Sequence, residues 1–182
     1  MPENHSRDDA HQELGRDLVA SSYLRGDFVL SSGARSSFYF DKYLFETKPA
    51  IMRRVAASLA ELVPAGVDRL AGPELGAVAL ATAVSLETGI PFVIVRKESK
   101  EYATSKVVEG EINAGERVLV VEDVITSAGE ALKAAAKLEA IGAEVAGILA
   151  VLDREQTGAA NIAAAGYTMQ ALFRLSELDV DS

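Results

Sequence analysis

The stretch Val118-Leu-Val-Val-Glu-Asp-Val-Ile-Thr-Ser-Ala-Gly-Glu130 decides how this chain folds, because it joins an apolar strand to a helix through a short loop. Its first four residues are typical of a parallel strand covered on both faces by helices. Two acids follow, Glu122 and Asp123, and then the small residues Thr126 to Gly129. Small residues allow successive backbone N–H groups to face one concavity at a helix N-terminus. The pattern predicts a phosphate-binding loop beside two carboxylates.

Strands and helices alternate on both sides of this stretch, which predicts an α/β fold with a doubly wound, mostly parallel sheet flanked by helices. In such sheets ligands bind beyond the carboxyl ends of the strands. The segments expected at those ends are residues 72–76, 122–130 and 153–154. Hydrophobic periodicity and turn residues predict strands over 67–71, 92–95, 117–121 and 144–152, and helices over 49–62, 77–87 and 129–141.

The chain is expected to form a single domain over residues 14–182, after a flexible N-terminal tail over 1–13 that holds little apolar surface. Residues 14–48 form an N-terminal helix and a small hood, and 49–182 form the α/β core with a mobile loop over 96–116. Apolar residues at helical spacing place the first helix before Gly26, and short strands follow at 28–30 and 38–40.

Composition excludes several classes of protein. The 182 residues contain 18 Lys and Arg against 27 Asp and Glu, a net charge of −9 that disfavours nucleic-acid binding. The absence of cysteine excludes disulfides, thiolate zinc sites and a cysteine nucleophile, and two histidines are too few for a histidine metal site. No apolar run approaches the roughly 20 residues that span a bilayer, and the N-terminus is unlike a signal peptide. We therefore expect a cytoplasmic protein without a membrane partner.

A basic cluster interrupts this acidic chain after the second strand of the core. Four cations, Arg96, Lys97, Lys100 and Lys106, accompany two acids over residues 95–106. On a mobile loop, such cations can stabilise a pyrophosphate leaving group. A solvated surface loop is the alternative interpretation.

Residues 118–130 resemble the motif of type I phosphoribosyltransferases that binds phosphoribosyl pyrophosphate (PRPP). Ala128 stands where glycine is frequent in that motif, and Glu130 where a small or hydroxyl residue is frequent. The alternative is that Thr126 only caps a helix and that the acids are solvated. The resemblance implies that PRPP contacts Glu122, Asp123, Val124, Ile125, Thr126, Ser127, Ala128, Gly129 and Glu130.

The order Arg96-Lys-x-x-Lys100 resembles the catalytic loop of the orotate phosphoribosyltransferase family. That family continues with His-Gly, whereas this chain has Tyr102 and Ala103, and tyrosine cannot supply a cation. The resemblance implies that Arg96, Lys97 and Lys100, together with Asp123, are catalytic, and that Arg96, Lys97, Lys100 and Tyr102 contact PRPP.

Three further segments resemble the same family. Residues 28–41 match its hood over the base, where Tyr39, Phe40 and Ser31 are expected to contact orotate; Ser31 stands where many members carry a lysine. An ordinary hairpin with Phe28 and Phe38 in the core is the alternative. Residues 72–76 match the loop that approaches pyrophosphate. Arg154, with Thr126, is expected to bind orotate, and the alternative is a salt bridge from Arg154 to Asp153 or Glu155.

The resemblance implies a phosphoribosyl transfer from PRPP to orotate that gives orotidine 5′-monophosphate and pyrophosphate in pyrimidine (UMP) biosynthesis. It further implies Mg²⁺, held mainly by PRPP near Glu122 and Asp123, and a homodimer that shares its catalytic loops across the interface. Two alternatives remain: a purine or other base phosphoribosyltransferase, and a catalytically weak PRPP-binding paralogue.

Overall fold

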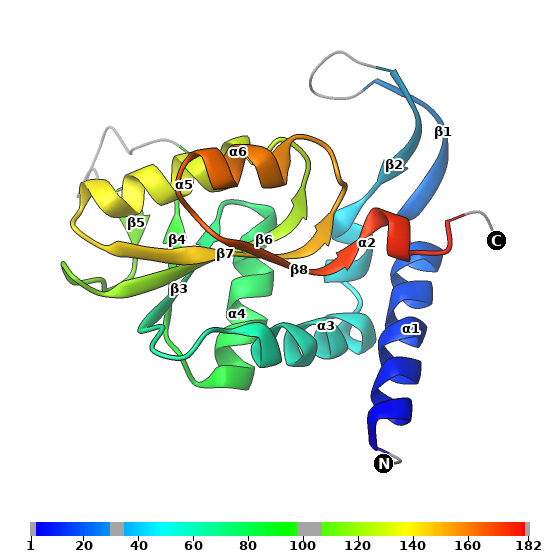
Figure 1. Ribbon diagram of the computed structural model, residues 1–182, viewed down its shortest axis with the longest axis horizontal. Helices are drawn as coiled ribbons and strands as arrows, with labels where there is room; N and C mark the ends of the chain where they lie inside the picture. Colours follow the sequence, from blue (N-terminus) through cyan, green and yellow to red (C-terminus); the bar gives the residue numbers. More distant parts are fainter. Residues whose placement is uncertain (1–2, 30–34, 98–106, 181–182) are drawn as a thin grey trace.

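A six-stranded sheet forms the centre of the protein, with the strand order β5-β4-β3-β6-β7-β8 (Figure 1). All neighbouring strands are parallel except β5, which runs antiparallel to β4. The computed structural model describes residues 3–29, 35–97 and 107–180. Its elements are α1 (Glu3–Ser22), β1 (Tyr23–Val29), β2 (Arg35–Phe40), α2 (Lys42–Glu46), α3 (Pro49–Leu62), β3 (Arg69–Pro73), α4 (Gly76–Thr88), β4 (Phe92–Val95), β5 (Val108–Glu109), β6 (Arg117–Ile125), α5 (Gly129–Ala140), β7 (Glu144–Asp153), α6 (Gly158–Ala164), β8 (Met169–Arg174) and the 3₁₀ turn η1 (Leu175–Glu177).

The predicted doubly wound, mostly parallel sheet is confirmed. Helices α3 and α4 cover one face of the sheet, and α5 and α6 cover the other (Figure 1). On β6, Leu119 and Val121 belong to the core on the α3 and α4 face, whereas Val118 and Val120 belong to the core on the α5 face. This division follows from the alternation of side chains along a strand, and it explains why the strand is apolar throughout.

The helix boundaries of the core agree with the sequence pattern. Helix α3 begins at Pro49, which suits the first turn of a helix because it has no N–H to satisfy. Helix α4 ends at Thr88 and is followed by the cap residue Gly89, whose φ of 74° is the left-handed conformation that favours glycine. Within the predicted loop 96–116, β5 forms a short hairpin with β4, and residues 98–106 lie outside the described part of the chain.

The N-terminal boundary differs from the prediction. Helix α1 begins at Glu3, so the tail expected over 1–13 is helical from residue 3 onward. The ring of His11 stacks on Phe173 of β8 with centroids 4.3 Å apart, a tertiary contact that local composition does not reveal. The helix ends at Ser22 and not near Gly26, because Tyr23 begins a strand that pairs with Phe40.

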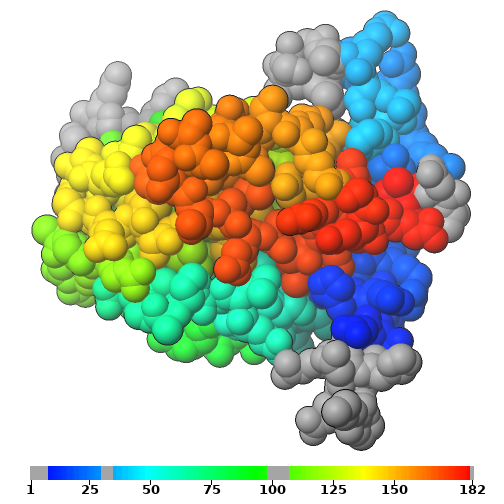
Figure 2. All heavy atoms as spheres, viewed as in Figure 1, coloured from blue at the N-terminus to red at the C-terminus, as the bar shows by residue number. Residues whose placement is uncertain are grey.

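Strands β1 and β2 form an antiparallel hairpin that projects from the body of the protein (Figures 1 and 2). It contains the strand predicted at 38–40 and residues 28 and 29 of the strand predicted at 28–30, whose last residue lies outside the described part of the chain, and both strands begin earlier than expected. Helix α2, which the sequence pattern did not predict, connects the hairpin to α3 and buries Phe45 completely. None of the described helices is long and apolar enough to cross a bilayer.

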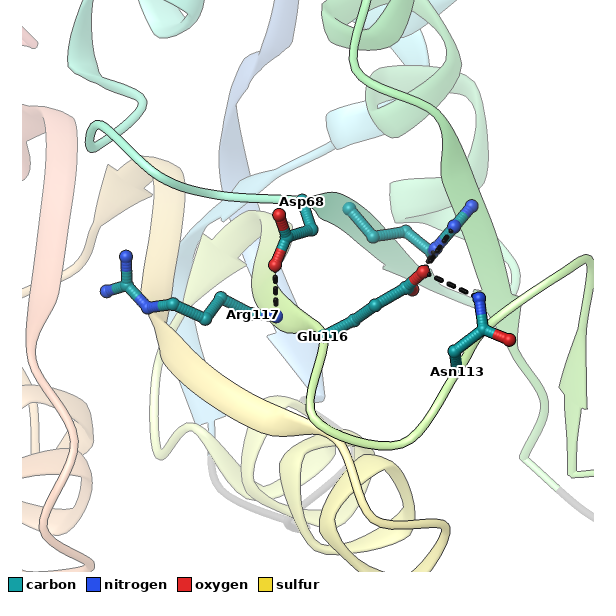
Figure 3. A network of polar contacts seen from close by, with 5 residues as sticks. Asp68, Asn113, Glu116 and Arg117 are labelled. Atoms are coloured by element: carbon teal, nitrogen blue, oxygen red, sulfur yellow. Dashed lines mark hydrogen bonds and ion pairs between the residues drawn. The ribbon is translucent and has the colours of Figure 1, made fainter.

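A polar network joins the amino ends of β3 and β6, at the edge of the sheet opposite the predicted ligand site (Figure 3). Arg69 donates two hydrogen bonds to Glu116, from Nε at 2.6 Å and from an Nη at 2.9 Å. Asn113 donates a third at 2.9 Å, and Asp68 accepts from the backbone N–H of Arg117. These bonds fix the register of the two central strands.

Candidate active site

The carboxyl ends of β3, β4, β6 and β7 lie along one edge of the sheet, because these strands are parallel neighbours. The segments predicted to bind ligand lie at these ends: residues 72–76, 122–130 and 153–154. Chain order reverses between β3 and β6, and sheets of this kind bind their ligands at such a reversal. The topology thus places all three predicted segments at one edge.

Asp123 is buried at this edge and pairs with a lysine that the sequence did not single out. The residue is 2% exposed, and its Oδ2 accepts a hydrogen bond from Nζ of Lys42 at 2.6 Å. Its Oδ1 accepts from the backbone N–H of Val124 at 2.6 Å. Gly76 at the start of α4 leaves room for the pair, because a Cβ there would lie 2.5 Å from Nζ of Lys42 and closer still to Asp123.

Two other carboxyl groups, those of Glu122 and Glu46, are buried near Asp123. Burial, and then the charge of Asp123, raise the pKa of Glu46 to about 8, with Lys42 opposing the rise. The same two causes raise the pKa of Glu122. Near neutral pH these two groups therefore retain protons, which limits repulsion within the cluster. Because neighbouring strand residues alternate, Glu122 lies on the α5 face and Asp123 on the α4 face.

The predicted phosphate loop is a short bend between β6 and α5. Ala128 has a φ of 63°, a left-handed conformation in which glycine is ordinarily preferred, and this explains the glycine that is frequent there in the family motif. Asn161 of α6 donates to the carbonyl of Ser127 at 3.0 Å. At Gly158, the first residue of α6, a Cβ would lie 2.8 Å from the carbonyl oxygen of Thr126. Helix α6 therefore supports this loop.

Glu130 follows the loop on the first turn of α5. It is exposed and forms an ion pair with Lys133 at 2.9 Å. The hydrogen bond from Lys133 lowers the pKa of Glu130, so the carboxylate is ionised and Lys133 balances its charge. The acid that departs from the family motif is thus paired with a neighbouring cation.

The predicted loop 96–116, which carries the basic cluster, begins directly after β4. The guanidinium of Arg96 lies 3.8 Å from a carboxylate oxygen of Glu74 and 3.6 Å from one of Glu109, and Lys97 is exposed. Ammonium Nζ of Lys137 on α5 donates to the backbone carbonyls of Arg96 at 2.6 Å and of Lys97 at 2.8 Å. The predicted contacts of Lys100, Tyr102 and Lys106 lie outside the described residues, as does Ser31 of the hood.

Arg154 directly follows β7 and contacts Phe38 of the hood. It is 8% exposed, its guanidinium carbon lies 4.6 Å above the ring centre of Phe38, and its buried Nε has no hydrogen-bond partner. Burial lowers the pKa of this guanidinium. Arg154 does not form the alternative salt bridges to Asp153 or Glu155. The carboxylate of Asp153 accepts a hydrogen bond from the backbone N–H of Glu155, and the carboxylate of Glu155 accepts from Ser176.

The two hood residues predicted to contact orotate, Tyr39 and Phe40, lie on opposite sides of β2. Phe40 is 5% exposed and packs in the core, with its ring centre 6.3 Å from that of Phe45. Phe38, expected in the core as the alternative, instead packs against Tyr23 and Arg154. Tyr39 is on the opposite side of the strand from both and is 39% exposed.

The described residues contain no cluster of three or more His, Asp or Glu side chains suited to a metal ion. Asp123 already bonds through both oxygens, and Glu122 favours its protonated form. Such a donor set fits Mg²⁺ only as a minor contributor beside phosphate and water ligands, which is how Mg²⁺ is commonly held at phosphate sites.

Comparisons with known proteins agree with this geometry. Residues 45–170 match the family model of the phosphoribosyl transferase domain. The orotate phosphoribosyltransferase of Thermococcus gammatolerans is 46% identical over 164 residues, which cover 88% of this chain and 87% of that protein. Leishmania donovani UMP synthase is 34% identical with a TM-score of 0.83, and the match covers 92% of this chain but 37% of that one. Mycobacterium tuberculosis orotate phosphoribosyltransferase, solved with PRPP, is 29% identical with a TM-score of 0.79 over 92% of this chain and 98% of that one.

Proposed function

The chain belongs to the phosphoribosyltransferase family, and within it to the orotate phosphoribosyltransferases; we propose that it transfers the phosphoribosyl group of PRPP to orotate at the site described above. The reaction releases pyrophosphate and forms orotidine 5′-monophosphate, a step of pyrimidine biosynthesis. The observation that carries the assignment of the site is Arg154, a buried guanidinium that stacks on Phe38 and has no ion pair among the described residues. A buried cation is costly without an anion, and orotate brings a carboxylate.

The charges of the site suit the chemistry of the transfer. The bond between ribose C1 and pyrophosphate breaks as the base nitrogen bonds to C1, and the carbon becomes cation-like. Asp123 supplies negative charge at the edge where the sugar would lie, and the backbone of residues 126–129 holds phosphate. Arg96 and Lys97 stabilise the charge that develops on the departing pyrophosphate. Each of these roles requires a side chain that is held in position before the substrate binds. The contacts of Asp123 and Arg96 described above hold these two side chains in position.

Mg²⁺ belongs to this proposal as a ligand held mainly by PRPP, and it supplies additional charge neutralisation for the pyrophosphate. Glu122 and Asp123 are the residues of this chain proposed to assist it. The cytoplasmic location and the contacts of Tyr102 stay predictions from the sequence.

A homodimer is also part of the proposal, and α4 offers a surface that supports it. Leu75, directly before the helix, and Ala79 and Leu86 on it are exposed at helical spacing, with Leu75 70% and Leu86 82% exposed. An apolar stripe of this kind on a helix is typical of a surface that packs against another chain. Sedimentation of the wild-type protein and of Leu86→Glu tests it: we expect a dimer that the glutamate weakens, and a monomeric wild type would contradict the proposal.

The test of the function is consumption of orotate in the presence of PRPP and Mg²⁺, with uracil, adenine and hypoxanthine as competing bases. We expect turnover of orotate alone. In Arg154→Ala, the loss of a buried charge pair with the substrate costs about 3 kcal/mol, so the KM for orotate should rise by about 100-fold. The KM for PRPP should change little. Arg53→Ala, on an exposed position of α3, is the matched control.

Three outcomes would contradict parts of the proposal. Turnover of a different base would reassign the substrate while keeping the PRPP site. PRPP binding without turnover would favour the weak paralogue. Equal changes in both KM values in Arg154→Ala would remove Arg154 from the orotate pocket.

A further inference from the structure

Lys137 makes a contact that the proposed chemistry does not yet use. It lies in the last turn of α5, where a lysine ordinarily interacts with the carbonyls of its own helix end. Its ammonium instead reaches another element and donates to the carbonyls of Arg96 and Lys97, at 2.6 and 2.8 Å. These are the first two residues after β4, and both are among the predicted pyrophosphate-binding cations.

The backbone of Arg96 is held on both sides by this arrangement. Its N–H donates to the carbonyl of Val107 at 2.9 Å, which closes the stem of the β4–β5 hairpin. Its carbonyl accepts from Lys137, and its side chain lies within ion-pair distance of Glu74, in the segment after β3. The direction of the Arg96 side chain therefore depends on a backbone position that Lys137 helps to fix.

Helix α5 connects this contact to the phosphate loop. Gly129 at the start of the helix and Lys137 are separated by a little over two helical turns, about 12 Å along a rigid axis. A bond from Lys137 to the residues after β4 thus sets the distance between the phosphate loop and the first cations of the basic loop. PRPP carries phosphate groups at both of its ends, so a site for it needs such a fixed distance.

We propose that Lys137 is a positioning residue that places Arg96 and Lys97 for the pyrophosphate group of PRPP. The inference rests on the proposed function, because it assigns Arg96 and Lys97 to that group. Lys137 acts through two charge-assisted hydrogen bonds to backbone carbonyls, and such bonds are stronger than neutral ones. Lys137 itself does not need to touch the substrate.

The test compares Lys137→Met with Lys137→Arg. Methionine keeps the length and helix propensity of lysine and removes the donors, whereas arginine keeps charged donors that can reach both carbonyls. We expect Lys137→Met to raise the KM for PRPP by about 10-fold, since misplaced binding groups lose preorganisation. The KM for orotate should change less than about 2-fold, and Lys137→Arg should recover most of the PRPP affinity. Lys48→Met, on an exposed residue, is the matched control.

Titration calorimetry of PRPP in the absence of orotate separates this proposal from the proposed function. If wild-type protein binds PRPP but does not consume orotate, the proposed function fails and the calorimetric comparison of the variants still tests Lys137. Wild-type PRPP affinity in Lys137→Met would overturn the inference. Equal increases in both KM values together with a lowered melting temperature would also overturn it, because that result indicates general destabilisation. Failure of Lys137→Arg to recover PRPP binding would overturn it as well.

Discussion

Gly76→Ala is expected to damage the site through a single methyl group. A Cβ at residue 76 would lie 2.5 Å from Nζ and 2.8 Å from Cε of Lys42, and closer still to Oδ2 of Asp123. Ordinary contacts of a Cβ begin near 3.4 Å, so these groups must move by about 1 Å, a shift that closely packed interiors resist. The end of Lys42 can move toward solvent, but Asp123 is 2% exposed and is held by the N–H of Val124.

The magnitude follows from two effects with opposite signs. Gly76 is the first residue of a helix and its φ is not left-handed, so alanine alone would stabilise by about 0.5–1 kcal/mol. Overpacking costs about 1–3 kcal/mol, which leaves a net loss between about 0 and 2.5 kcal/mol. A displacement of about 1 Å at a group that positions substrate lowers kcat/KM by about 100-fold. The effect on activity should therefore be the larger of the two.

Urea unfolding and the rate of orotate consumption measure these two quantities. Gly129→Ala is the matched control for stability, because Gly129 also begins a helix and its Cβ would meet nothing closer than Oγ of Ser127 at 3.7 Å. We expect Gly129→Ala to be at least as stable as the wild type. If Gly76→Ala were equally stable and kept its kcat/KM within about 2-fold, the packing argument for the pair of Lys42 and Asp123 would be refuted.

Two further predictions concern pH and stability. The pKa of Glu46 is about 8 in the folded protein and ordinarily near 4.5, so the folded state holds an extra proton between these values and stability should fall as pH rises from about 5 to 8. Glu46→Gln should flatten this slope in urea unfolding, and an unchanged slope would contradict the burial of that carboxyl. Hydrogen bonds from Arg69 and Asn113 lower the pKa of Glu116 to about 2, so its contribution is present above pH 4.5 and is lost as pH falls toward 2. Glu116→Gln should lower the free energy of unfolding by about 1–2 kcal/mol at pH 7 and leave the KM values for orotate and PRPP unchanged. A changed KM would mean that the network influences the candidate active site at the opposite end of the strands.

The sheet and its phosphate loop were predictable because their signals are local. The apolar run of β6, the acids at its end and the small residues before α5 are consecutive in the chain, and hydrophobic periodicity reports each element independently of its neighbours. The same local geometry shows that Tyr39 and Phe40 do not both contact the base, although it does not say which of them does. Tyr39 and Phe40 are adjacent in a strand and so point to opposite sides, which means that both cannot face one ligand.

The remaining features depend on contacts between distant parts of the chain. Lys42 and Asp123 are separated by 81 positions, Lys137 and Arg96 by 41, and nothing in either local pattern indicates a partner. The same holds for the stacking of Arg154 on Phe38. The sequence by itself determined most strands and helices of the core, the fold class and the types of residue at the strand ends. Only the tertiary structure decided which charges are paired. Pairing depends on how the chain folds back on itself, because folding brings side chains into contact irrespective of their separation in sequence.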